Sequence, residues 1–306
     1  DLESGARIEI DESKDSPLDF ALWKFSETAP FWDSPWGTGR PGWHIECSAM
    51  SIKYLGENFD IHGGGRDLIF PHHENEIAQS ESFTGKQFAK IWMHAGMITI
   101  NGEKMSKSVG NIKSVSHVLN NWGANVIRLF CMSGHYSKPI DYTENLLKEN
   151  LVRWRQVETC YYELILGDGH GDIEIVKEMI ETHERQFDEA MSDDFNTPLA
   201  LTAFFNMIKE LNVLASEEKI SKQISDIALP ILDRLLNILG LKIIKVTDDE
   251  KESIIKLIKN RDEMRERKQF DEADKIRDKI SSMGITLIDH KSKTLWMKKE
   301  NIKTDS

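Results

Sequence analysis

The chain has 306 residues, of which 40% are hydrophobic and 29% are charged. This balance is ordinary for a globular protein of one or two domains, or three if they are small, that can bury a core. No apolar run is long enough to span a membrane, so we expect no transmembrane helix and no membrane partner. The formal net charge of −12 argues against a surface that is basic throughout. Residues 251–306 carry a small excess of Lys and Arg, which would permit local phosphate contact, although a solvated helical face is the simpler interpretation.

The three cysteines are Cys47, Cys131 and Cys160, and no C-x-x-C motif joins any two of them. This pattern predicts no disulfide framework and indicates a reducing compartment, so a cytoplasmic location is expected.

The first 115 residues are rich in Gly, Pro and Trp and contain short apolar runs. Residues 34–48 predict a loop that leads into a helix. Residues 58–65 predict a short strand that ends in a glycine turn, and residues 90–100 predict a second buried strand. Alternating strands, glycine turns and helices predict an α/β sheet with its site at the strand ends.

After residue 144 the pattern becomes helical. Apolar side chains recur at helical spacing in four segments, which are residues 147–164, 173–187, 198–211 and 227–239. Pro198 suits a helix first turn, and Gly240 suits a helix end. We expect a helical bundle whose apolar stripes form its core.

The C-terminal segment predicts a small α/β unit. Thr247 and Glu250 have capping-box spacing and open a charged helix toward Lys268, and a second helix covers residues 271–283. Residues 285–299 predict a hairpin. Its Trp296 is expected either in the core of this unit or stacked on an RNA base.

The segment FPHHENEIAQS places two histidines and two glutamates within five residues. Pro71 suits a first helical turn and acidic residues suit a helix N-terminus, so a plain helix start is one interpretation. His72 and Glu76 are four residues apart on one helix face, so they can also converge on a metal ion. His73 with Glu76 is the rival pair.

Cys47 is a candidate third ligand, because zinc binds Cys, His and carboxylate side chains and prefers four positions. A lone cysteine is more often a small buried residue, and spacing alone does not join Cys47 to His72.

The segment EKMSKSVGN carries Lys104 and Lys107, three residues apart. Two cations on a loop can neutralise charge that develops on a phosphate chain. Taken alone, a Lys/Ser-rich surface loop is the simpler interpretation, and the motif G-x-x-x-x-G-K is absent.

The segment HGGGRDL is a weaker signal. Gly65 permits close backbone approach, and Asp67 can accept hydrogen bonds from a ribose diol. A simple turn is the alternative.

Together these segments resemble cysteinyl-tRNA synthetase, a class I aminoacyl-tRNA synthetase. The resemblance extends over essentially the whole chain, through GWHIECSAM, FDIHGGGRDLIFPHHENEIAQSE, KMSKSVGN, GANVIRLFCMSGHYSKPIDY, SDDFNTPLAL and RERKQFDEADKIRDKISSMGITL. The Lys-Met-Ser-Lys-Ser motif alone indicates only class I. The His-His-Glu-Asn-Glu and Trp-His-Ile-Glu-Cys segments together are specific to the cysteine enzyme and its close relatives.

The resemblance implies an α/β plus all-α architecture in four parts. Residues 1–115 would be the C-terminal part of a Rossmann catalytic domain, with the zinc site and the Lys-Met-Ser-Lys-Ser loop. Residues 116–145 would be a connecting, stem-contact segment. Residues 146–245 would be a tRNA-binding helical bundle, and residues 246–306 a small α/β anticodon-binding domain.

The resemblance also implies the reaction, in which L-cysteine is activated by ATP with Mg²⁺ and transferred to tRNA(Cys). A zinc ion held by Cys47, His72 and Glu76 would bind the substrate thiolate, and Trp43 would lie beside the substrate. Lys104 and Lys107 would be the catalytic cations. These two lysines, Gly65 and Asp67 would bind ATP, and a monomer is expected.

One departure from the family pattern affects these expectations. The family carries His-Ile-Gly-His near its N-terminus, just after a further zinc-ligand cysteine, and neither occurs in this sequence. We therefore expect a fragment that is inactive by itself.

Three other functions remain open from the sequence. A cysteine:amino-sugar ligase of the same fold would share the zinc site and ATP, but it needs no anticodon-like tail. A zinc hydrolase would leave the Lys-Met-Ser-Lys-Ser loop without a role. A non-catalytic tRNA- or zinc-binding fragment is the third.

Overall fold

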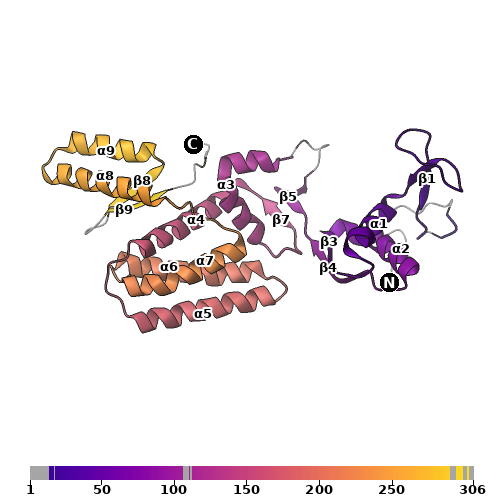
Figure 1. Ribbon diagram of the computed structural model, residues 1–306, viewed down its shortest axis with the longest axis horizontal. Coiled ribbons are helices and arrows are strands. Elements are labelled where there is room, and N and C mark those ends of the chain that lie inside the picture. Colours follow the sequence, from indigo (N-terminus) through magenta and orange to yellow (C-terminus); the bar gives the residue numbers. More distant parts are fainter. Residues whose placement is uncertain are drawn as a thin grey trace. The chain divides into compact units, whose positions relative to one another are not determined.

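The computed structural model describes residues 14–16, 18–105, 110, 112–289, 294–298 and 302 (Figure 1). The chain divides into two compact units, one of residues 1–97 and 137–139 and one of residues 98–136 and 140–306. This division falls earlier than the expected boundary at residue 115. No helix of the described ranges is long and apolar enough to cross a membrane.

The described part of the first unit contains an antiparallel and a parallel strand pair, two α-helices and the short helical segments η1 and η2. Its elements are β1 (Trp23–Phe25), β2 (Gly39–Pro41), α1 (Trp43–Leu55), β3 (Phe59–Gly65), η1 (Arg66–Leu68), η2 (Ile69–His73), α2 (Glu74–Thr84) and β4 (Ala89–Ala95). Strands β1 and β2 pair antiparallel, whereas β3 and β4 pair in parallel from Phe59↔Ala89 to Gly65↔Ala95. The predicted strand at 58–65 is confirmed, but the glycine turn is not, because β3 continues through Gly65 in register with β4. Helix α2 is the crossover that parallel pairing requires.

The second predicted strand, over residues 90–100, is in fact two strands. Strand β4 ends at Ala95, and β5 (Ile98–Ile100) pairs with β7 (Ile140–Tyr142) and with β6 (Glu103–Lys104) in the second unit. The break lies at Gly96, where a Cβ atom would lie only 2.0 Å from the carbonyl oxygen of Lys138. Because β5 finds its partners after this break, the boundary between the units falls at Met97.

The second unit is built around a helical bundle (Figure 1). Its helices before the C-terminal segment are α3 (Val115–Met132), α4 (Glu144–Ile165), α5 (Ile173–Ser192), α6 (Thr197–Ser216) and α7 (Lys222–Leu239). The four predicted helical segments are confirmed as α4 to α7, and their apolar stripes form one buried core. Burial of such stripes supplies most of the stability of helices in a folded chain.

Side-chain caps set the first residue of each bundle helix. The caps of α4, α5, α6 and α7 are Thr143, Asp172, Asn196 and Ser221, and each side chain accepts a hydrogen bond from a first-turn backbone N–H. Such a cap stabilises a helix by about 1 kcal/mol. Gly240 ends α7 with a φ of 66°, a left-handed conformation that favours glycine.

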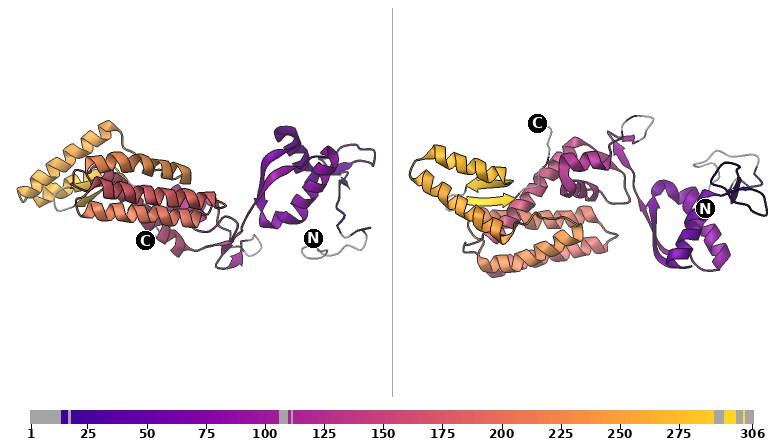
Figure 2. Two further views of the ribbon diagram at one scale, coloured as in Figure 1. Left: turned by 90° about the horizontal axis from the view of Figure 1, so that it is seen from below. Right: turned by 45° about the horizontal axis from the view of Figure 1, so that its top comes forward.

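The C-terminal segment folds as predicted, with two helices beside a hairpin (Figure 2). Its elements are α8 (Asp248–Glu266), α9 (Phe270–Ser282), β8 (Ile285–Asp289) and β9 (Thr294–Lys298). The predicted capping box of Thr247 and Glu250 is present. Trp296 is buried in the core of this segment, which makes it a packing residue.

Candidate metal centre

The irregular turn η2 presents two neighbouring histidines before α2 begins. His72 and His73 are both buried, and the acidic residues of the first turn of α2 follow directly. Phe70 has extended backbone angles, so the helical backbone is interrupted there and the helical residues that lead into α2 begin after it. The segment is thus a helix start in its backbone, and the buried side chains add a polar cluster that a helix start does not need.

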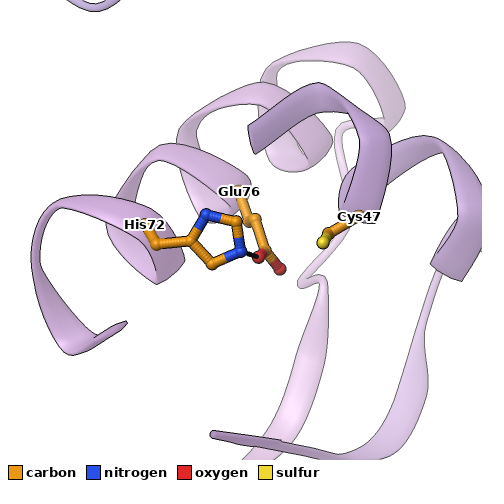
Figure 3. Close-up of side chains that lie close together, drawn as sticks. All are labelled: Cys47, His72 and Glu76. Carbon is orange, nitrogen blue, oxygen red and sulfur yellow. Dashed lines mark ion pairs between the residues drawn. The ribbon is translucent and has the colours of Figure 1, made fainter. Parts of the chain in front are cut away.

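Cys47, His72 and Glu76 point toward one another (Figure 3). Their donor atoms, one sulfur, one nitrogen and one oxygen, all lie within 4.8 Å of each other. His72 and Glu76 come from η2 and α2, and Cys47 comes from α1, which packs against α2. The fold therefore brings together the three residues that the sequence analysis could not join by spacing.

Glu76 is the most informative member of this cluster. It is fully buried, and neither carboxylate oxygen accepts a hydrogen bond among the described residues. The Nε2 atoms of His72 and His62 lie 2.5 Å and 3.1 Å from its two oxygens. Burial raises the pKa of Glu76 to about 7. A buried carboxylate without donors is costly, and a cation at this position would compensate that cost.

The donor set fits a zinc ion. Thiolate, imidazole and carboxylate are its usual protein ligands, and three protein donors leave a position for a further ligand. Burial, followed by the neighbouring Glu76 and Glu46, raises the pKa of the Cys47 thiol. A bound cation would oppose that shift, because a coordinating thiol is deprotonated.

The sequence analysis missed three further histidines around this cluster. The Nδ1 atoms of His44 and His72 lie 2.8 Å apart, and Nδ1 of His73 lies 2.8 Å from Nε2 of His94. Nδ1 of His72 thus faces His44 while its Nε2 atom faces Glu76. A second contact on the other ring nitrogen orients a metal-binding imidazole.

The pKa of each of these histidines is lowered, first by burial. For His73 the pKa falls to about 4. The rings are therefore neutral near pH 7, which is the form that binds metals. His73 also belongs to a second donor group, with His62 and Glu76, so the rival pair is close in space as well.

Strand pairing explains why His62 and His94 were missed. His62 stands opposite Trp92, and His94 stands opposite Gly64, in the parallel register of β3 and β4. The two strands of this pair are far apart in the sequence, so the pairing cannot be read from local spacing. Gly64 lets the strand approach closely, because a Cβ atom there would lie 2.7 Å from Cε1 of His73. The position of His62 directly before the glycine run was the available signal.

The other predicted binding residues of this unit lie near the end of β3 or at the start of α1. Trp43 stacks on His72, with ring centroids 4.0 Å apart and 20° between the planes, and its side chain remains half exposed. Asp67 is exposed in η1, and a Cβ atom on Gly65 would lie 2.3 Å from its Oδ1 atom. Gly65 is thus needed for this close turn, and the roles of these residues toward substrates stay predictions.

The structure does not describe the side chains of the two predicted catalytic lysines. Lys107 lies outside the described residues, and of Lys104 only the backbone is described, in β6 opposite Thr99. Their roles also stay predictions.

Comparisons with known proteins bear on this geometry. The family model for the tRNA synthetases class I (C) catalytic domain matches residues 1–152, and the DALR domain model matches residues 186–243. The second match covers α6, α7 and the end of α5, inside the helical bundle.

Curated relatives match nearly the whole chain. Cysteine--tRNA ligase of Thermodesulfovibrio yellowstonii is 47% identical, over 98% of this chain and 66% of the relative. The enzymes of that name from Geobacter sulfurreducens and Bacillus cereus are 44% and 46% identical, over 97% of this chain and 66% and 65% of the relatives. The chain thus spans slightly less than two thirds of the length of these relatives.

Among solved structures, Mycobacterium tuberculosis methionyl-tRNA synthetase in complex with methionyl-adenylate matches 59% of this chain and 42% of its own, at 17% identity and a TM-score of 0.49. That likeness is too low to bear on the fold. The family model and the relatives at 44–47% identity show that the chain belongs to the cysteine--tRNA ligase family of class I tRNA synthetases.

Proposed function

We propose that the protein activates L-cysteine with ATP to cysteinyl-adenylate and transfers the cysteine to the 3′ end of tRNA(Cys). Cys47, His72 and Glu76 are proposed to hold a zinc ion that selects the substrate. The observation that supports this most strongly is the convergence of these three donors, together with the full burial of Glu76, whose carboxylate accepts no hydrogen bond from the residues that the structure describes.

Such a site suits the discrimination that a cysteine enzyme needs. A pocket that senses only size gains little between cysteine, serine and alanine, whereas a group that requires a specific partner discriminates far more. When bound, zinc would supply that partner, because it holds a thiolate and binds a hydroxyl much more weakly. The chain's own contribution is to fix the donors, with His72 between Glu76 and His44 and with Trp43 stacked across its ring.

The remaining residues are proposed to position ATP. The substrate carboxylate is already a nucleophile, so the first step requires placement and charge neutralisation rather than a general base. Lys104 and Lys107 would neutralise the departing pyrophosphate, with Mg²⁺ bound to the nucleotide. Gly65 and Asp67 would hold the ribose, for which the tight turn at the end of β3 is suited.

We also propose that the protein acts as a monomer in the cytoplasm. The free thiols of Cys47, Cys131 and Cys160 agree with a reducing compartment.

Substitution of Cys47 tests the zinc assignment. In the full-length protein, Cys47→Ser should lower bound zinc and cysteine-dependent ATP–pyrophosphate exchange together, because a serine hydroxyl is a poor zinc ligand. Zinc is measured by mass spectrometry after dialysis. Cys131→Ser is the matched control, since Cys131 lies in α3 and outside the cluster, and it should leave both quantities unchanged. Unaltered zinc stoichiometry in Cys47→Ser would refute the ligand assignment.

A further inference from the structure

A hydrogen bond joins α1 to α2 directly beside the candidate metal centre. Ser48 follows Cys47 in α1 and is buried, and its Oγ atom donates to Oε1 of Gln79 in α2, 3.2 Å away. Gln79 lies three residues after Glu76, so the two side chains share one face of α2. The Ser48–Gln79 bond therefore connects the immediate surroundings of two of the three proposed zinc ligands.

Another polar contact lies between α1 and η2, on the other side of Cys47 in the sequence. There Nδ1 of His44 lies 2.8 Å from Nδ1 of His72. His44 and Ser48 are four residues apart on one face of α1, so the two contacts bracket the sulfur donor. The other two donors come from η2 and α2 (Figure 3). The placement of α1 against α2 thus sets the distance from Cys47 to Glu76.

The Ser48 hydroxyl is the partner of the Gln79 amide in a buried place. Ser48 is only 2% exposed, and its one proton is shared between Oε1 of Gln79 and the carbonyl oxygen of His44, 3.3 Å away. The Nε2 atom of Gln79 is buried and has no hydrogen-bond partner among the described residues. Loss of the hydroxyl would also leave Oε1 without this donor, and an unpaired buried amide is costly. The pair thus favours one position of α2 relative to α1.

We propose that Ser48 and Gln79 are positioning residues of the metal site. Their hydrogen bond holds α1 against α2, so that Cys47 keeps the spacing from His72 and Glu76 at which all three bind one ion. Groups that orient metal ligands change the affinity for the metal without touching it. If the pair served packing alone, its loss would lower the stability of the fold and leave the metal affinity as it is. The inference rests on the proposed function, because it takes zinc as the ion.

The zinc affinity of the full-length protein tests this role. Ser48→Ala removes the donor, and Gln79→Met removes the acceptor while it keeps a side chain of similar length. Each should weaken zinc binding by roughly tenfold, as expected when a group that orients a metal ligand is lost. Ser80→Ala is the matched control, because Ser80 is an equally buried serine of α2 whose Oγ atom has no hydrogen-bond partner among the described residues. It should bind zinc like wild type, and competition with a chromophoric chelator measures each affinity.

The absorption spectrum of the cobalt-loaded protein separates positioning from packing. Co²⁺ accepts the same kinds of donor as zinc, and its visible bands report the donor set and its geometry. Ser48→Ala and Gln79→Met should weaken the band that arises from the Cys47 thiolate, whereas Ser80→Ala should give the wild-type spectrum. Thermal unfolding of the metal-free proteins measures any loss of stability independently.

Wild-type zinc affinity and wild-type cobalt spectra in Ser48→Ala and Gln79→Met would overturn the inference alone, whatever the thermal stability of these variants. A wild-type protein that binds no zinc would overturn the zinc assignment of the proposed function and this inference with it. Zinc binding by the wild type, together with weaker binding and altered cobalt spectra in both variants, supports both.

Discussion

A single carboxylate explains much of the chemistry of the metal centre. Glu76 lies within reach of Nε2 of both His62 and His72, yet it accepts no hydrogen bond among the described residues. Burial raises its pKa, so the ionised form is disfavoured unless a positive charge is near. A metal ion at the proposed site would provide that charge, and zinc would suit the sulfur and nitrogen donors beside it.

His72 and His73 allow a direct test of which imidazole is the ligand. We expect that His72→Asn in the full-length protein lowers zinc affinity by more than tenfold, because a donor atom to the metal is lost. His73→Asn should reduce zinc affinity less, since His73 does not belong to the donor group that includes Cys47. Competition with a chromophoric chelator measures both affinities. A larger loss in His73→Asn would assign the metal to the group of His62, His73 and Glu76.

Local signals account for most of the elements. The apolar stripes of α4 to α7 and the capping box before α8 are short-range features, and each was predicted. The hairpin of β8 and β9 was predicted for the same reason. The break of β4 from β5 at Gly96 was not, because it depends on the carbonyl group of Lys138 about 40 residues later in the chain.

The candidate metal centre was predicted only in part, because some of its residues are joined by short-range spacing and others by long-range pairing. His72 and Glu76 share a helix face, so their spacing was informative. Cys47 was a candidate because zinc binds thiolates, and the family resemblance joined it to the other two. His62 and His94 were missed because strand register brings them to the site, and a single sequence does not reveal register.

An ion pair within the C-terminal segment ties the hairpin to α8. The buried Arg261 donates hydrogen bonds to Asp289 at 2.7 Å and 3.0 Å, and Arg265 donates another at 2.8 Å. The hydrogen bond from Arg261 is the main cause that lowers the pKa of Asp289 below its usual value. Asp289 thus stabilises the folded form above about pH 4, its unfolded pKa, and this contribution is lost as the pH falls further.

Asp289→Asn should therefore destabilise the hairpin at neutral pH, because the buried Arg261 would keep only Asp262, 3.2 Å away, as an anionic partner. Asp289 is partly exposed, so solvent screening reduces the expected loss to about 1–2 kcal/mol. Hydrogen exchange of the β8 amides measures it, and the difference from wild type should shrink below about pH 4. The control Asp278→Asn, at an exposed residue of α9, should exchange like wild type. A difference that persists unchanged at acid pH would contradict this role.

At the scale of the whole molecule, the two units carry different parts of the proposed reaction. The first unit holds the candidate metal centre, and the second holds the helical bundle. The same relatives match both units, since proteins named cysteine--tRNA ligase match 97–98% of the chain. In the proposed function, selection of cysteine belongs to the first unit.

Removal of zinc from the full-length protein tests the central claim most directly. A chelator should abolish cysteine-dependent ATP–pyrophosphate exchange, and added zinc should restore it, because the proposed site recognises the substrate only through the metal. Exchange is measured with cysteine and with serine before removal, after removal and after restoration. We predict exchange with cysteine only, and only in the zinc-loaded protein. Wild-type exchange with cysteine after complete zinc removal, verified by mass spectrometry, would contradict the account.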